Sequence, residues 1–244
     1  MSKKIYIVGM GPGAEEKMTG EAIMALEEAD IIIGYNVYLE LLGERFANKE
    51  KLSTPMKREV ERCRLCLDKA REGLTVALIC SGDAGVYGMA SLMYEISQDE
   101  AEVELVVIPG VTAAVSGAAL LGAPINHDFC VISLSDLLTP WDKIVTRIKA
   151  AAEGDFCIVI YNPSSIKRRD YMQKICDILL ERIEPDRPCG YVENIGREGT
   201  KVTITTLKEL RSVSLNMFTT VFIGNSDTIV INDKMIAKRG YKIE

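Results

Sequence analysis

The sequence is poor in several side chains on which binding and catalytic sites often depend. It has one histidine and one tryptophan in 244 residues, and aromatic residues make up only 6% of the chain. Positive charge is also in deficit, because 29 Lys and Arg stand against 35 Asp and Glu and give a net charge of −6. Nucleic-acid binding needs clustered cations, so this balance argues against it. A local basic pocket for an acidic small molecule stays compatible with it.

Long apolar runs and paired cysteines are missing too. No run reaches the ~18 apolar residues of a membrane span. The start, MSKKIYIVGMG, has a short apolar run that meets Gly-Pro-Gly, so no signal peptide is expected. The seven cysteines are an odd number, and several lie in apolar, strand-like runs. This favours reduced thiols in a cytoplasmic protein. Cys63 and Cys66 lack the second pair of a zinc site, so no protein-bound metal is expected.

What the chain does have is a repeated switch between strand-like and helix-like patterns. Residues 4–8, 75–80 and 103–108 are typical of strands, whereas 19–29, 58–72 and 111–121 have the spacing or composition of helices. This alternation predicts an α/β fold with mostly parallel sheets. A length of 244 residues divided by about 150 gives about 1.6 domains. The interruption LGAPINH near 122–127 then predicts two α/β domains, 1–124 and 125–244.

A glycine-rich loop, Gly9–Gly13, directly follows the first strand. It loosely fits the G-x-G-x-x-A fingerprint of dinucleotide sites. However, Pro12 offers no N–H to a pyrophosphate, and the acidic Glu15 and Glu16 follow at once. Two other interpretations remain: a tight strand-to-helix turn, or a loop approached by a bulky ligand without phosphate.

Two further loops follow predicted strands, where open α/β sheets bind ligands. The loop 81–88, SGDAGVYG, contains Asp83, which is either a cap of the next helix or a hydrogen-bond acceptor for a ligand. The loop 109–114, PGVTAA, contains Thr112, which is either a helix cap or a hydroxyl contact.

The three loops, in the order GxGPG, GDxGxY and PGVT, resemble the tetrapyrrole (corrin/porphyrin) methyltransferase family, which uses S-adenosylmethionine. The resemblance spans nearly the whole chain. The segments HDF, ISLSDLLTPW, IYNPSSIKRR and NIGREG are similar to one branch, which methylates carbon 17 of a precorrin-3-type macrocycle in cobalamin synthesis. The resemblance implies two domains with S-adenosylmethionine in the cleft between them, contraction of the macrocycle, and a homodimer.

The resemblance also assigns residues. The cofactor contacts it implies are Gly82, Asp83, Val86, Tyr87, Thr112, Ala113, Tyr161, Asn162, Asn194 and Thr220. The substrate side of the first loop comprises Gly9, Gly11, Pro12 and Gly13. A substrate rich in carboxylates needs guanidinium or ammonium groups. The candidates are Lys167, Arg168, Arg169 and Arg197, with a solvated basic surface as the alternative.

Ring contraction requires proton movement, hence an acid or base. His127 is the first candidate because its ordinary pKa suits proton transfer, and Asp136, after a predicted strand, is the second. Other functions also fit parts of the pattern. They are methylation of another tetrapyrrole or of diphthamide on the same fold, an NAD-dependent oxidoreductase, and a non-catalytic binding protein.

Overall fold

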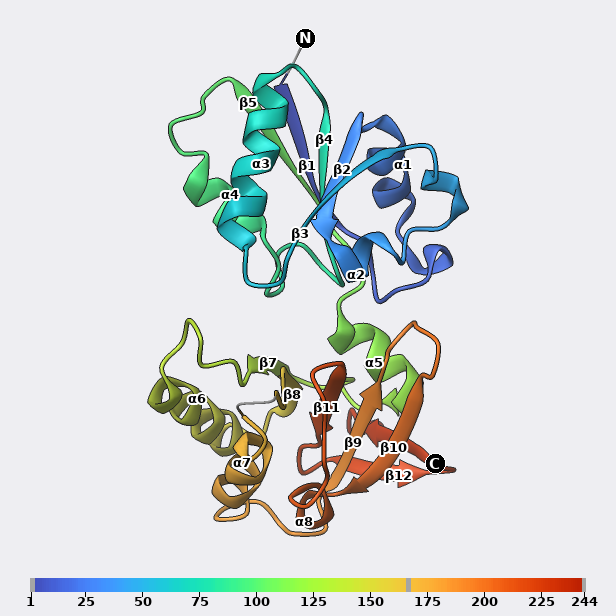
Figure 1. The fold of residues 1–244 in the computed structure, drawn as a ribbon. Coiled ribbons are helices and arrows are strands. Elements are labelled where there is room, and N and C mark those ends of the chain that lie inside the picture. The colour runs from blue at the N-terminus through green and yellow to red at the C-terminus, as the bar shows by residue number, and fades with distance from the viewer. Residues whose placement is uncertain (1–2, 166–167, 243–244) are drawn as a thin grey trace. The chain divides into compact units, whose positions relative to one another are not determined.

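The computed structural model describes residues 3–165 and 168–242. The chain forms two compact units, Met1–Ala113 and Ala114–Glu244. Each unit is a layered arrangement of helices and strands (Figure 1), so the predicted α/β class is confirmed. In the described part of the chain, no helix is long and apolar enough to cross a membrane.

The first unit contains a parallel sheet in the order β3-β2-β4-β1-β5. Its strands are β1 (Lys3–Gly9), β2 (Ile31–Tyr35), β3 (Glu50–Thr54), β4 (Val76–Cys80) and β5 (Val103–Ile108). Its helices are α1 (Gly20–Glu28), α2 (Asn36–Leu39), α3 (Glu59–Arg71) and α4 (Ala90–Ile96), with 3-10 turns at Glu15–Lys17 and Glu44–Phe46. The strands β2 and β4 are almost wholly buried, as expected for parallel strands covered on both faces.

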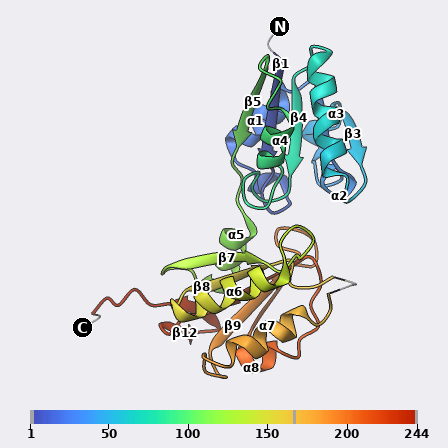
Figure 2. The same ribbon diagram turned by 90° about the vertical axis from the view of Figure 1, so that its left-hand side faces the viewer.

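Alternation along the strands divides the apolar side chains between two cores. Ile31 and Ile33 face α3 and α4, whereas Ile32 between them faces α1. Figures 1 and 2 show these helices on opposite faces of the sheet. The side chain of Thr19 accepts a hydrogen bond from the Ala22 amide (3.1 Å) and caps α1. Helices therefore cover both faces of the sheet. Because its strands are parallel, their carboxyl ends lie at the same edge.

The second unit has a five-stranded sheet in the order β10-β9-β11-β8-β7. Its elements are α5 (Ala113–Leu121), β6 (Gly122–Ala123), β7 (Phe129–Ser133), α6 (Trp141–Glu153), β8 (Cys157–Tyr161), α7 (Tyr171–Leu179), β9 (Pro188–Glu193), β10 (Lys201–Thr206), α8 (Leu207–Leu210), β11 (Thr219–Ile223), β12 (Thr228–Ile231) and β13 (Lys234–Ala237). In this sheet β7 and β8 pair in parallel and the other described pairs are antiparallel, and in the smaller sheet β12-β13-β6 the pair β13 and β6 is parallel. Parallel pairing thus dominates the first unit and not the second, where β11 lies antiparallel between β8 and β9.

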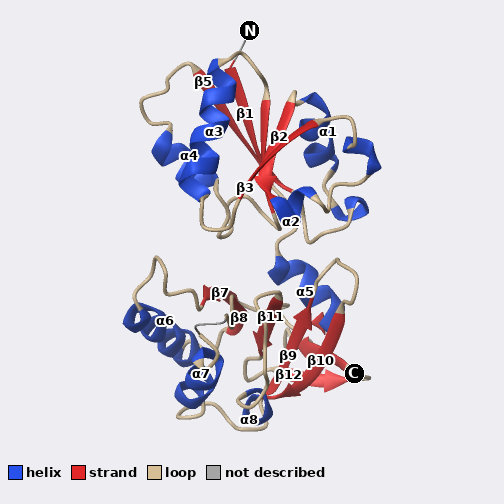
Figure 3. Ribbon diagram, in the orientation of Figure 1, coloured by secondary structure: helices blue, strands red, loops and turns tan. Residues whose placement is uncertain are grey.

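The division between the two compact units falls at Ala113–Ala114, whereas the predicted domain boundary follows residue 124. The packing of α5 accounts for the difference. A side chain at Gly117 would come within 2.9 Å of the Phe222 ring, and one at Gly190 within 2.6 Å of Leu121. The helix therefore packs closely on β9 and β11, on the face opposite the core formed with α6 and α7 (Figure 3). In the sequence, the small residues of α5 follow the strands of the first unit directly. In the structure, they allow the helix to pack against the sheet of the second unit.

Candidate functional site

Three glycine-rich loops meet at the carboxyl edge of the first sheet. They follow β1, β4 and β5, which are neighbours in the order β4-β1-β5. The amide of Gly11 donates to the Gly82 carbonyl (3.0 Å), and the Gly82 amide donates back to the Gly11 carbonyl (2.8 Å). The Met10 amide donates to the Cys80 carbonyl (2.9 Å). The first and second loops are therefore joined backbone to backbone.

The glycines permit these close approaches. A Cβ on Gly110 would lie 2.1 Å from the Gly82 carbonyl oxygen, and a Cβ on Gly9 would lie 2.6 Å from the Gly110 nitrogen. Neither distance accommodates a side chain, and the obstacles are backbone atoms. Gly9, Pro12 and Gly13 are buried. In the first loop, Gly9 and Gly11 therefore serve contact between loops, a role that was not among the interpretations made from the sequence.

Asp83 joins the second loop to the third. Its Oδ1 accepts from the amides of Gly85 (2.8 Å) and Val86 (3.0 Å), and its Oδ2 accepts from the amide of Gly110 (2.9 Å). The following helix, α4, begins only at Ala90, with Met89 as its N-cap residue. Asp83 is therefore not the cap of that helix. Both of its oxygens are used to hold the two loops in register.

Tyr87 lies in the same loop in an unusual backbone conformation. Its φ is +55°, in the left-handed region that bulky residues rarely adopt, and its side chain is 57% exposed. Gly88 beside it could not carry a Cβ, which would lie 2.3 Å from the Ala84 carbonyl oxygen. The surrounding loop therefore enforces the strain at Tyr87, and such strain is concentrated at functional sites.

Arg62, which was not predicted from the sequence, contacts the second loop where it ends at Met89. The residue is on α3 and only 3% exposed. It donates to the Thr54 Oγ1 (2.8 Å), to the Pro55 carbonyl (3.1 Å) and to the Met89 sulfur (3.4 Å). A guanidinium inside a fold needs such partners. Nothing in the charged sequence REVERCRLC distinguishes Arg62 from its exposed neighbours except its place on the apolar face.

In the second unit, four predicted cofactor residues lie at one edge of the sheet. Tyr161 ends β8 opposite Ser133 at the end of β7. Thr220, at the start of β11, pairs with Val192 near the end of β9, and Asn194 follows that strand. Tyr161 accepts a hydrogen bond from the Ala114 amide (2.6 Å), and the Asn162 side chain donates to Ser133 Oγ (2.9 Å). Asn162 and Asn194 both have positive φ, at +52° and +51°.

The same edge carries a polar network around Asp136. The Tyr171 hydroxyl donates to Asp136 Oδ2 (2.6 Å), and this hydrogen bond is the main cause that raises the pKa of Tyr171. Arg168 Nε lies 3.8 Å from Asp136 Oδ1, and its Nη1 donates to the Leu134 carbonyl (3.0 Å). The ring of Tyr171 also packs on Trp141, with centroids 4.3 Å apart. Asp136 is therefore positioned by groups from both sides.

His127, the first acid–base candidate from sequence, lies at the opposite end of β7 from Asp136. It precedes Phe129, where the strand begins, whereas Asp136 follows Ser133, where it ends. A strand of five residues spans about 17 Å. His127 Nδ1 accepts from the Asp128 amide (2.9 Å). The structure therefore does not bring the two acid–base candidates together.

The basic candidates for the substrate are only partly available. Lys167 lies outside the described residues. Arg168 is largely committed to Leu134 and Asp136, whereas Arg169 is exposed. The Arg197 guanidinium lies 5.4 Å from the Phe218 ring centroid, a cation–π distance.

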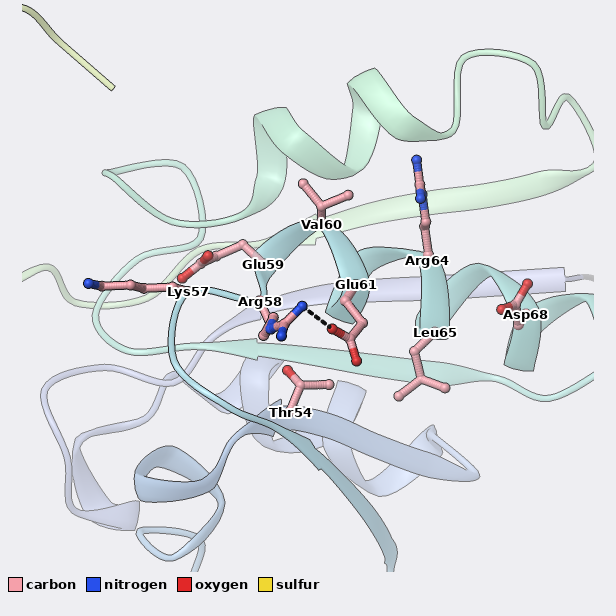
Figure 4. Close-up of a pocket in the computed structure, with 9 residues that line it drawn as sticks. All are labelled: Thr54, Lys57, Arg58, Glu59, Val60, Glu61, Arg64, Leu65 and Asp68. Atoms are coloured by element: carbon pink, nitrogen blue, oxygen red, sulfur yellow. Dashed lines mark ion pairs between the residues drawn. The ribbon is translucent and has the colours of Figure 1, made fainter. Parts of the chain in front are cut away.

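A surface hollow of about 580 Å³ lies elsewhere in the first unit. Its lining comprises Thr54, Lys57, Arg58, Glu59, Val60, Glu61, Arg64, Leu65 and Asp68. Figure 4 shows these side chains pointing in different directions around the first turns of α3, with Arg58 directed at Glu61. None of the predicted site residues lines it, and its charges are mixed. The hollow is therefore no candidate for the cofactor.

Burial protects most of the thiols. All seven cysteines are free, and six are buried. Burial raises the pKa of Cys80 to about 11 and that of Cys63 to about 12. Among the described residues, no group of three His, Cys, Asp or Glu is arranged to hold a metal ion. Cys63 and Cys66 both lie in the core between the sheet and α3.

The fold and the loops at the strand ends define an α/β protein that could bind a ligand at those ends. Comparison with known proteins identifies the family. A model of the Tetrapyrrole (Corrin/Porphyrin) Methylases matches residues 4–211. The chain belongs to this family and is a methyltransferase, as predicted.

Similar proteins agree with this. The cobalt-factor III methyltransferase of Priestia megaterium is 46% identical over 99% of this chain, which spans only 46% of that protein. A probable cobalt-factor III C(17)-methyltransferase of Salmonella typhimurium is 44% identical over 98% of this chain and 100% of that protein. The crystal structure of the methyltransferase CobJ has a TM-score of 0.88 and 33% identity over 96% of this chain and 99% of that chain. The chain thus spans about half of the first relative and all of the second.

Proposed function

We propose that the protein methylates carbon 17 of a precorrin-3B macrocycle, or of a cobalt-bearing counterpart, in cobalamin synthesis, with contraction of the ring, so that precorrin-3B gives precorrin-4. The observation that carries this is the likeness to a relative of that name along the full length of both chains. Both relatives reported above are named for cobalt-factor III, which favours the cobalt-bearing substrate. The methyl donor is S-adenosylmethionine.

The first-unit edge fits such a donor better than a dinucleotide. The amides of Met10 and Gly11 are already bonded to Cys80 and Gly82, and Pro12 has none. A pyrophosphate needs free amides at this place. A sulfonium ligand has no phosphate and does not need them. This argues against an oxidoreductase that binds NAD.

The residues proposed to hold the donor are Gly82, Asp83, Val86 and Tyr87 of the second loop with Thr112 and Ala113 of the third, and Tyr161, Asn162, Asn194 and Thr220 of the second unit. When bound, the donor supplies an electrophilic methyl carbon on a sulfonium. The protein's own contribution is alignment and exclusion of water, which can lower the barrier of such a transfer by several kcal/mol. Asp83 contributes by fixing the loop, because its oxygens already accept from three amides.

Asp136 is the better candidate for moving protons. It lies at the edge where Tyr161 and Asn162 lie, next to the Tyr171 hydroxyl, whereas His127 lies at the far end of β7. Asp136→Asn should therefore slow ring contraction and leave binding of S-adenosylhomocysteine intact. The variant His127→Ala should contract the ring at the rate of the wild type. The reverse pattern would return the role to His127.

Mass spectrometry after a single turnover tests the function. The protein, S-adenosylmethionine and cobalt-factor III are mixed, with metal-free precorrin-3B as the second substrate. The expected product carries one additional methyl group, and it forms faster from the cobalt-bearing macrocycle. Absence of methyl transfer to both, or tight binding of NADH without binding of S-adenosylhomocysteine, would overturn the proposal. Methylation of a different tetrapyrrole alone would move the enzyme to another branch of the family.

Two properties go with this function. We place the enzyme in the cytoplasm, which seven unpaired cysteines support because that compartment keeps thiols reduced. We also expect a homodimer, as the family resemblance implies, and light scattering of the purified protein tests it.

A further inference from the structure

The loop 134–140, called here the leucine loop, presents two neighbouring apolar side chains to solvent. Leu137 is 65% exposed and Leu138 is 98% exposed. Single exposed leucines are ordinary, but an adjacent pair is less so. The sequence LSDLLTPW was singled out as a motif, and nothing in the fold accounts for this pair.

The leucine loop is held firmly at its ends. The Leu134 amide donates to the Tyr161 carbonyl (2.9 Å), and the Ser135 amide donates to Ser133 Oγ (3.2 Å). Further along, Asp136 accepts from Tyr171 (2.6 Å), and α6 begins at Trp141. The loop thus has defined anchors up to Asp136 and again at Trp141, and the two leucines lie between them.

We infer that Leu137 and Leu138 form a contact surface for the apolar face of the macrocycle, an inference that rests on the proposed function. The loop leaves the sheet beside Tyr161 and Asn162, which are proposed to hold the methyl donor. Arg168 is bonded to the loop itself, and the neighbouring Arg169 is exposed. A flat ring with carboxylate arms matches apolar side chains with an exposed guanidinium group near them in the chain.

The size of the surface favours a small ligand over a second copy of the chain. Two leucine side chains offer on the order of 200 Å². A stable protein interface buries about 800 Å² on each partner. The two leucines can cover a substantial part of one face of a macrocycle, but they make up only a quarter of such an interface.

The test compares the wild type with a Leu137→Ser, Leu138→Ser double variant in titrations with cobalt-factor III. The only tryptophan of the chain, Trp141, borders the loop and reports binding by fluorescence quenching, with the visible absorbance of the macrocycle as a second signal. The dissociation constant is expected to rise at least tenfold. Because both side chains are exposed, the melting temperature and the affinity for S-adenosylhomocysteine should stay as in the wild type.

Two control variants sharpen the comparison. Leu137→Met with Leu138→Met keeps the apolar surface and should bind within threefold of the wild type. Met24→Ser removes an apolar side chain that is 62% exposed on α1 of the other unit, and it should bind normally. In turnover, the serine variant should show a raised KM with kcat within about twofold of the wild type.

Several results would overturn the inference. They are unchanged macrocycle binding by the serine variant, equal weakening by the methionine variant, and loss of a dimer with macrocycle binding intact. If the wild type methylates cobalt-factor III while the serine variant binds it as tightly, only the inference about the leucine loop fails. If the wild type neither binds nor methylates any of the macrocycles, the proposed function fails and the inference fails with it.

Discussion

Replacing Asp83 by alanine tests whether this residue holds the loops together or contacts the ligand. The change removes three hydrogen bonds, to the amides of Gly85, Val86 and Gly110. A hydrogen bond to a charged group contributes about 1.5–3 kcal/mol net. Because one half-buried carboxylate is shared by the three, their contributions do not add in full. The expected loss in the free energy of unfolding is about 2–4 kcal/mol, a fall of about 5–15 °C in melting temperature.

The assay is thermal unfolding of the protein without ligand, followed by circular dichroism, together with hydrogen exchange of the Gly110 amide. In the alanine variant this amide should exchange much faster, because its acceptor is gone. Asp83→Asn separates the two halves of the contact. The amide oxygen can still accept from Gly85 and Val86, but the amide nitrogen then opposes the Gly110 N–H, donor against donor. Its cost should therefore be about that of the loop-to-loop bond alone.

Asp99→Ala is the matched control, because Asp99 is an exposed carboxylate in the turn before β5 of the same unit. It should melt within ~2 °C of the wild type. If Asp83→Ala also melts there, with Gly110 still protected and the affinity for S-adenosylmethionine reduced, the reasoning is refuted. Asp83 would then contribute to ligand binding alone and not to joining the loops.

Three further predictions concern the same unit. Gly110→Ala should lose about 3 kcal/mol in chemical denaturation, because its Cβ would lie 2.1 Å from the Gly82 carbonyl oxygen, whereas Gly20→Ala, with open space around it, should not destabilise. Arg62→Met should lose about 1–3 kcal/mol by leaving the Thr54 and Pro55 oxygens unpaired, and Arg64→Met on the exposed face should be near neutral. Finally, the free energy of unfolding should fall as the pH rises from about 9 to about 12, because unfolded thiols ionise at their ordinary pKa of 9.0 while Cys80 and Cys63 stay protonated to about 11 and 12. A Cys63→Ala, Cys80→Ala variant with an equally steep decline in urea titrations would contradict that assignment.

The fold was largely predictable because its strands carry a strong local signal. The runs IIIGY of β2 and VALIC of β4 are apolar on both faces. Such continuous apolar runs are typical of parallel strands that are covered on both faces. The helix α5 was also predicted, but the residues on which it packs were not. Its glycine and alanines pack against Phe222, more than a hundred residues away in the sequence, and no local pattern carries that information.

In the candidate site, too, local features could be predicted from the sequence and long-range contacts could not. The loops could be placed after strands, and the parallel order β4-β1-β5 then brings them to one edge. The role of Asp83 was not accessible, because its partner Gly110 belongs to a loop 27 positions further on. Arg62 was missed for a similar reason. A buried arginine and an exposed one look alike in a charged helix until the partners across the fold are known.

Three of the proposed cofactor residues share an unusual backbone conformation. Tyr87, Asn162 and Asn194 all have positive φ although none is glycine, and all three lie in segments that follow strands at a sheet edge. Asparagine tolerates this conformation, but tyrosine adopts it at a cost of about 1 kcal/mol or more. A residue with such a backbone conformation must be held in it by its surroundings. Around Tyr87, the loop is fixed by the contacts of Asp83, Gly88 and Arg62. The energy stored at Tyr87 is therefore balanced by contacts within the first unit before any ligand arrives. A loop already fixed in this way loses little further conformational freedom on binding, and preorganisation of this kind is what a reaction governed by alignment requires.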